Sequence, residues 1–411
     1  MASEPSPMRE IELGALAITG ASDPQILRIV AAVDVMIKRG PADFLIVPLR
    51  PRLAVLRPPH PLRLARLMFH PLDLLVVRAA RWRPGQQTIP RSAIKPMVEH
   101  VRLAMGTAAA AIGTAIAGRT TAEVDVISRF GGTLWPQAAA ILTDPAVPES
   151  WSQTGLGIAN YRPLADAVAA LLAEAAVLDR LRLDAASGLL PAEFQAVAAM
   201  LGRVAQANRG ALPMMIAVLL DRWPEAAESV PAARCGLQQN AIRDATDDAA
   251  ELLLRQLEQQ NGLETRIAAG TLADAGAAAA RIASLLKHLG LANVNALRRE
   301  RLRAARRRLA AACQARFAAG LQEQLLAPLS RIGVASANVA ALEAAARGLR
   351  VLETESRAAG NGSTYDLLLG KATEAITADT MRGRLSRTEQ LRLVEILAGS
   401  DAALALLDQA Q

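Results

Sequence analysis

The chain has 411 residues, of which 52% are hydrophobic and only 3% are aromatic, and its formal net charge is +7. A chain of this length can bury a large core, and this hydrophobic content excludes disorder for most of it. Alanine, the strongest helix former, is unusually abundant, which favours packed helices over sheets. We therefore expect a mostly α-helical protein with two or three domains.

The charge is unevenly distributed along the chain. Residues 50–95 contain ten basic residues and one acid, Asp73, whereas residues 144–258 contain nine basic and fifteen acidic residues. Such polarity can attract an anionic partner, join two parts of one chain, or join two copies of it. All three outcomes remain open from the sequence.

The two cysteines, Cys235 and Cys313, lie far apart and have no CxxC partner. This pattern suggests neither a disulfide framework nor a thiolate metal site, and it fits a cytoplasmic protein. The N-terminus has no basic start before its apolar residues, so we expect no signal peptide. The most apolar run, residues 103–118, is too short to cross a bilayer, so we expect a buried helix there and no transmembrane segment.

In chain order, the first predicted helix begins at Asp23 and Pro24 and ends at Gly40. The dense prolines of residues 41–96 then indicate an irregular, arginine-rich region with short elements, among them one or two short strands. The sequence TTAE at residues 120–123 predicts a capping box that starts the next helix.

Proline, glycine and serine interrupt the pattern at residues 143–163, and we place a domain boundary there. The predicted parts are a basic, proline-punctuated N-terminal region, residues 1–155, and a helical domain, residues 156–411. In the second part, helical periodicity recurs at residues 164–178, from residue 191 onward and at residues 242–257, and capping boxes are predicted at residues 261–264 and 386–389. No repeat period is present, so an irregular helical bundle or a HEAT-like solenoid is expected.

The tripeptide His-Pro-Leu occurs twice, beginning at His60 and at His70. With Asp73, these histidines could form a metal site, but a helix between them would hold the two rings about 15 Å apart. The simpler interpretation is that each proline lies at the start of a helix or turn. We expect two similar element starts and no metal site.

Two arginine-rich segments are candidate binding surfaces. In the first, arginines surround one tryptophan that could stack on a base, and its candidate residues are Arg63, Arg66, Arg81, Trp82 and Arg83. The second is a predicted helix at residues 295–317, whose apolar face comprises Leu302, Ala305, Leu309, Ala312 and Cys313. Its candidate binding residues are Arg298, Arg299, Arg301, Arg303, Arg306, Arg307 and Arg308. This helix could contact nucleic acid or acidic lipid, remain solvated, or face the acidic stripe of residues 244–258.

No motif in the chain specifies a reaction or a cofactor. The Gly-Lys at residues 370–371 lacks the spacing and the following hydroxyl of a phosphate-binding loop, and residues 155–160 lack a dinucleotide fingerprint. No nucleophile motif is present, and the acids of residues 244–258 have no ExxH partner.

We therefore expect a non-catalytic scaffold or regulator that binds another macromolecule, most simply a protein, through helix faces and an arginine-rich surface. The first alternative is nucleic-acid binding through residues 298–308 and 50–95, and an anionic membrane surface or self-association also fits the charge pattern. A second alternative is an enzyme whose site assembles from dispersed residues. Its candidates are His60, His70, Asp73, Trp82 and Tyr161.

Overall fold

The computed structural model describes residues 21, 23–35, 46–49, 52–53, 59–181, 191–226, 230, 237–259, 262–268, 270–290, 295–331, 339–358, 363–378 and 385–408. Nearly all regular structure in these ranges is helical, which confirms the predicted all-α class. The packing divides the chain into two compact units, residues 1–253 and residues 254–411.

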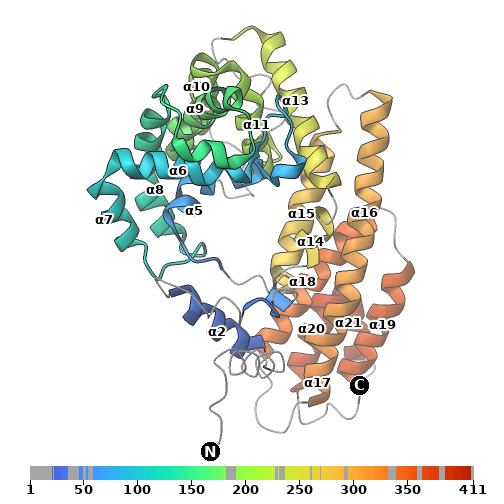
Figure 1. Ribbon diagram of the computed structural model, residues 1–411. Helices are drawn as coiled ribbons and strands as arrows, with labels where there is room; N and C mark the ends of the chain where they lie inside the picture. The colour runs from blue at the N-terminus through green and yellow to red at the C-terminus, as the bar shows by residue number, and fades with distance from the viewer. Residues whose placement is uncertain are drawn as a thin grey trace, which may run out of the picture. The chain divides into compact units, whose positions relative to one another are not determined.

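The first unit comprises the following elements, of which the α-helices are labelled in Figure 1. They are α2 (Asp23–Val35), α5 (Leu64–Phe69), the 3-10 helix η1 (His70–Leu75), β1 (Val76–Val77), η2 (Ala79–Arg81), β2 (Ile89–Pro90), α6 (Arg91–Met105), α7 (Thr107–Ala115), α8 (Val124–Leu142), η3 (Glu149–Thr154), η4 (Ile158–Asn160), α9 (Tyr161–Arg180), α10 (Pro191–Ala207), η5 (Arg209–Ala211), α11 (Leu212–Arg222) and α13 (Gln239–Glu258), which continues past the division between the units.

The centre of the first unit is the packing of α8 against α5, α6 and α9. Trp135 of α8 is fully buried, and its indole N–H donates to the carbonyl oxygen of Leu67 in α5 at 3.0 Å. Arg162, in the first turn of α9, donates to the carbonyl oxygen of Leu142 at 3.0 Å, where α8 ends. This contact supplies a cation to the negative end of the α8 dipole and holds the two helices together. The predicted boundary after residue 155 therefore lies within the first unit, between two helices that pack on each other.

The periodic stripes predicted in this unit form the buried faces of their helices. Leu164, Val168, Leu171, Leu172, Ala175 and Leu178 of α9 are all buried, as are Ile242, Ala245, Ala249, Leu252 and Leu253 of α13. Glu174 is buried on α9, and both of its oxygens accept from Arg203 of α10 at 2.7 Å. The ion pair between Glu174 and Arg203 thus joins α9 to α10, in addition to the burial of the apolar face of α9.

The proline-rich region contains the short strands that the sequence suggested. Val76 and Val77 of β1 pair in parallel with Ile89 and Pro90 of β2. The second His-Pro-Leu begins the 3-10 helix η1 with Pro71 in its first turn, as expected. The first one differs, because Pro61 forms an isolated antiparallel bridge with Thr120.

Three predicted elements need correction or lie beyond the described residues. Residues 103–118 do not form one buried helix. Gly106, at a φ of +52°, separates α6 from α7, and α7 buries only Ala109 and Ile112, whereas four of its five alanines face outward. The helix predicted from residues 120–123 begins later, at Val124; the backbone N–H of Thr120 donates to Glu123 at 2.9 Å, but only that half of the capping box forms. The first helix, α2, is described to Val35, and its predicted end at Gly40 lies outside the described residues.

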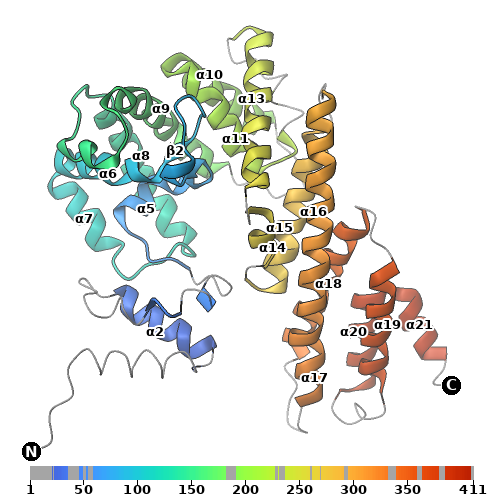
Figure 2. The same ribbon diagram turned by 45° about the vertical axis from the view of Figure 1, so that its right-hand side comes forward.

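The second unit is labelled in Figure 2. Its elements are α14 (Gly262–Ala268), α15 (Leu272–His288), α16 (Ala296–Gly320), the π-helix η7 (Leu321–Leu326), α17 (Ala327–Arg331), α18 (Val339–Ala358), α19 (Ser363–Thr377), α20 (Arg387–Ala398) and α21 (Ser400–Asp408). The predicted capping box at Ser386 and Glu389 is confirmed at the start of α20, whereas Asn261 of the other predicted box lies outside the described residues.

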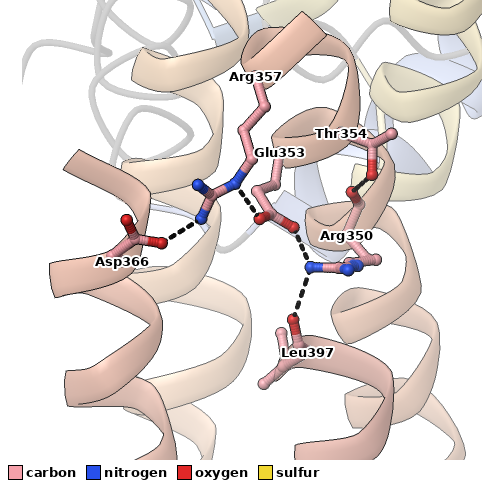
Figure 3. Close-up of polar contacts among 6 residues, drawn as sticks. All are labelled: Arg350, Glu353, Thr354, Arg357, Asp366 and Leu397. Atoms are coloured by element: carbon pink, nitrogen blue, oxygen red, sulfur yellow. Dashed lines mark hydrogen bonds and ion pairs between the residues drawn. The ribbon is translucent and has the colours of Figure 1, made fainter. Parts of the chain in front are cut away.

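Helix α18 is the hub of the second unit and packs against α15, α16 and α20. Gly348 lets α15 approach closely, because a Cβ there would lie 2.6 Å from the carbonyl carbon of Leu272. On another side of α18, buried Glu353 accepts hydrogen bonds at 2.5 Å from Arg350 and from Arg357 (Figure 3). Arg357 also donates to Asp366 of α19 at 2.5 Å, so this cluster ties α18 to its neighbour.

Candidate binding surfaces

The arginine-rich helix predicted at residues 295–317 is α16, the longest helix of the second unit. It begins where the side-chain oxygen of Asn295 accepts from the backbone N–H of Arg298 at 2.8 Å, which satisfies an otherwise unpaired amide. Its buried side chains include four of the five residues of the predicted apolar face, Leu302, Ala305, Leu309 and Cys313, and Ala312 is half-buried.

Two of the candidate arginines are engaged in the packing of α16. Arg301 makes a two-pronged ion pair with Glu258, at 2.6 and 2.8 Å, and Arg308 makes another with Glu264 of α14, at 2.8 and 2.7 Å. The hydrogen bonds from Arg308 lower the pKa of the Glu264 carboxyl below its usual range. Arg298 is also buried. These three side chains stabilise the helix in its place and contribute little to an outer surface.

The other candidate arginines of α16 are exposed, and one of them, Arg306, also donates to the carbonyl oxygen of Leu286 in α15 at 3.1 Å. These side chains share one side of the helix over about 12 Å, because Arg303 follows Arg299 by four residues and is itself followed by Arg306 and Arg307 after three and four residues. We call them the α16 arginine face. Glu300 accepts from Arg303 at 3.3 Å and from Arg307 at 3.2 Å, and all three of these side chains are more than half exposed. Exposed pairs contribute only about 0–1 kcal/mol, so a partner can displace them easily.

The N-terminal candidate residues do not form a stacking surface. Trp82 is only 8% exposed, and its indole N–H donates to the carbonyl oxygen of Thr88 at 3.0 Å. Arg66 donates to the carbonyl oxygen of Pro61 at 2.6 Å, and Arg83 donates to that of Trp82 at 2.9 Å. Arg63 and Arg81 are exposed. The tryptophan ring therefore belongs to the core, and a base could not stack on it without unpacking the loop.

The residues of the enzyme alternative lie in different surroundings, except that His70 and the exposed Asp73 share the 3-10 helix η1. His60 is exposed, whereas Tyr161 is fully buried edge-on against Trp151, with ring centres 4.9 Å apart. His70 is half-buried, and burial, reinforced by Arg222, lowers its pKa below the ordinary value. Within the described ranges, no group of three or more histidine, cysteine, aspartate or glutamate side chains could hold a metal ion.

Two hollows beside α6 were not anticipated from the sequence. The first, of about 260 Å³, is lined by Ala65, Arg91, Ile94, Lys95, Val98, Glu99 and Arg102. The second, of about 570 Å³, is lined by Glu99, His100, Leu103, Pro148, Glu149, Ser150, Ser152 and Gln153. Neither contains a residue of the enzyme alternative. The helical spacing of Arg91, Lys95 and Arg102 after Pro90 was the sequence signal that could have revealed the first one.

Comparison of the chain with protein-family models, with curated proteins and with solved structures found no match. Of the helices in the described part of the chain, none has both the length and the apolar character needed to span a bilayer. The class to which the observations lead is thus an all-α protein with an exposed arginine face on one helix.

Proposed function

We propose that this protein is a non-catalytic helical scaffold or regulator that binds an acidic protein partner through the α16 arginine face. One observation carries the proposal: the structural ion pairs of α16 use Arg301 and Arg308, yet four more arginine side chains remain exposed on the same helix beside one carboxylate, Glu300. This excess of positive charge would attract an acidic surface over a long range, and the weak pairs with Glu300 would exchange for pairs with the partner.

The choice of a protein over a nucleic acid rests on the aromatic residues. Single-stranded nucleic acids are commonly held by bases stacked on exposed aromatic rings. Among the described residues, the large exposed hydrophobic side chains are all aliphatic, and Trp82 is buried. Binding of duplex DNA through its phosphates needs no such ring, and it is the outcome that the experiment must separate from protein binding.

The experiment measures the anisotropy of two fluorescent probes, an oligo-glutamate peptide and a short DNA duplex, as the full-length protein is added at increasing salt. In the test variant, Arg299, Arg303, Arg306 and Arg307 are all replaced by glutamine. We expect the peptide to bind the natural protein in preference to the duplex, and the variant to bind the peptide at least about tenfold more weakly, a change of about 1.4 kcal/mol.

The matched control replaces Arg129, Arg180, Arg209 and Arg243 by glutamine, because these side chains are also exposed and the net charge changes by the same amount. We expect the control to bind the peptide as the natural protein does. Equal losses in both variants would mean that net charge alone attracts the probe, and the proposal would be wrong. If the duplex binds tightly and its affinity falls steeply between about 50 and 200 mM salt, the nucleic-acid alternative replaces the proposed protein partner.

A further inference from the structure

Helix α6, in the first unit, has two contrasting sides. Ala93, Pro96, Met97 and Val101 are buried, and α6 packs against α5 and α8. The opposite side carries a row of charged residues at helical spacing, which begins at Arg91 in the first turn and ends at Arg102 in the last. The row spans eleven residues, or about 16 Å along the helix axis.

The rim of the first hollow is cationic. Arg91, Lys95 and Arg102 are exposed on it, and Glu99 is the one acid among them. None of these four side chains makes an ion pair with another residue in the part of the chain that the structure describes. In contrast to Arg301 and Arg308 of α16, these side chains take part in no ion pair among the described residues.

The floor of the hollow is apolar. Ala65 of α5 and Ile94 and Val98 of α6 form it, and all three are half-buried. Its volume, about 260 Å³, is below the range of roughly 300–1,000 Å³ typical of small-molecule pockets. It exceeds the cavity of about 150 Å³ that holds a benzene-sized group. An open groove of this size suits one or two apolar side chains that protrude from a partner.

We propose that this groove, which we call the α6 groove, docks an acidic amphipathic helix of a partner protein. Apolar side chains of that helix, spaced three or four residues apart, fill the floor over Ala65, Ile94 and Val98. Its flanking carboxylates pair with Arg91, Lys95 and Arg102, and Glu99 disfavours a carboxylate at the middle of the groove. Charge complementarity identifies the occupant as acidic, and the apolar floor favours a peptide over a nucleic-acid backbone.

This inference concerns a different unit and a different helix from the α16 arginine face, and either proposal can fail without the other. The probes are three synthetic helical peptides of equal length: one with leucines on one face flanked by glutamates, a second with lysines for the glutamates, and a third with glutamines for the leucines. Their binding is measured by fluorescence anisotropy with the full-length protein that carries the α16 quadruple glutamine substitution, so that the α16 arginine face does not contribute to the binding of the acidic peptides.

We expect only the leucine–glutamate peptide to bind this α16-substituted protein well. A charge-reversed variant, Arg91→Glu with Lys95→Glu and Arg102→Glu, should lose at least tenfold in affinity for this peptide and gain affinity for the leucine–lysine peptide. The control, Arg129→Glu with Arg180→Glu and Arg209→Glu, reverses three other exposed charges and should leave the affinity for the leucine–glutamate peptide unchanged. Because the reversed side chains are exposed, far-UV circular dichroism should show unchanged folding.

Four results would overturn the proposal. The leucine–glutamate peptide could fail to bind, the glutamine-substituted peptide could bind equally well, or the charge-reversed variant could retain its affinity. Finally, sedimentation could show that the natural protein self-associates and that the charge reversal abolishes this association, in which case a second copy of the chain, and not a separate partner, occupies the groove.

Discussion

The ion cluster around Glu353 tests how burial changes the stability contribution of an ion pair, because its members differ in their contact with water. The Glu353 side chain is 2% exposed, whereas those of Arg350 and Arg357 are 44% and 34% exposed. Removing both arginines leaves a carboxylate buried without its charge partners. Removing the carboxylate leaves two arginines that can turn toward water.

The magnitudes follow from this asymmetry. The double variant Arg350→Met with Arg357→Met should lower the free energy of unfolding by about 3–5 kcal/mol, the usual consequence of an uncompensated buried charge. Glu353→Leu should lower it by about 2 kcal/mol at most, because it breaks two partly exposed pairs worth up to about 1 kcal/mol each. The triple variant with all three changes should be more stable than the double arginine variant, because no charge remains buried.

Urea unfolding followed with two signals measures these effects. All four tryptophans, Trp82, Trp135, Trp151 and Trp223, lie in the first unit, so their fluorescence reports on that unit, whereas far-UV circular dichroism reports on both. We expect the circular dichroism transition to move to lower urea in the double variant.

The matched control replaces Arg303 and Arg307 by methionine, because their partner Glu300 is exposed, and it should lose less than about 1 kcal/mol. The reasoning would be refuted if Glu353→Leu were more destabilising than the double arginine variant, or if the control were equally destabilised.

Further predictions concern packing, pH and thiol reactivity. Gly348→Ala should destabilise the second unit by about 1–3 kcal/mol, because the added Cβ would collide with the backbone of α15. In contrast, Gly370→Ala on α19 should leave stability unchanged or raise it by up to about 1 kcal/mol, because no atom lies within 4 Å of the added Cβ. Thermal melts of the two variants test the difference. The lowered pKa of His70 means that folding favours its neutral form, so its contribution to stability is complete above pH 6.5 and is lost as the pH falls through the lower folded value. Unfolding followed by tryptophan fluorescence should therefore depend less on pH below 6.5 in His70→Gln, and an unchanged dependence would contradict this. Burial raises the pKa of Cys313 to about 12. In a Cys235→Ser protein, a thiol reagent at mildly alkaline pH should therefore react with Cys313 only as fast as the second unit unfolds. An immediate reaction would contradict this, because it would show that the thiol is accessible.

The two proposed surfaces together describe a protein with a binding site on each unit. The α6 groove combines an apolar floor with a cationic rim, which favours a folded amphipathic segment. The α16 arginine face is more purely electrostatic. We expect binding at α16 to weaken with salt more strongly than binding at α6, because apolar burial is not screened by ions.

The sequence alone determined the all-α class and the inward faces of several helices. The stripe from Leu164 to Leu178 and the apolar face of residues 302–313 are visible because helical periodicity is a local property of the chain. The same holds for the cap at Ser386, which needs only residues three apart. The prediction from sequence was wrong at residues 103–118, because a single apolar run there contains the break at Gly106 and the mostly exposed helix α7.

Only the tertiary structure decided which arginines are used within the chain and which face outward. Arg301 and Arg308 meet Glu258 and Glu264, which lie 43 and 44 residues away in the sequence, and nothing in the local pattern distinguishes them from the exposed Arg303. The burial of Trp82 and the joining of Ala65 with α6 into a groove likewise depend on contacts between elements. The physical reason is that periodicity orients side chains about their own helix axis, whereas the partner of each charge is set by how the helices pack.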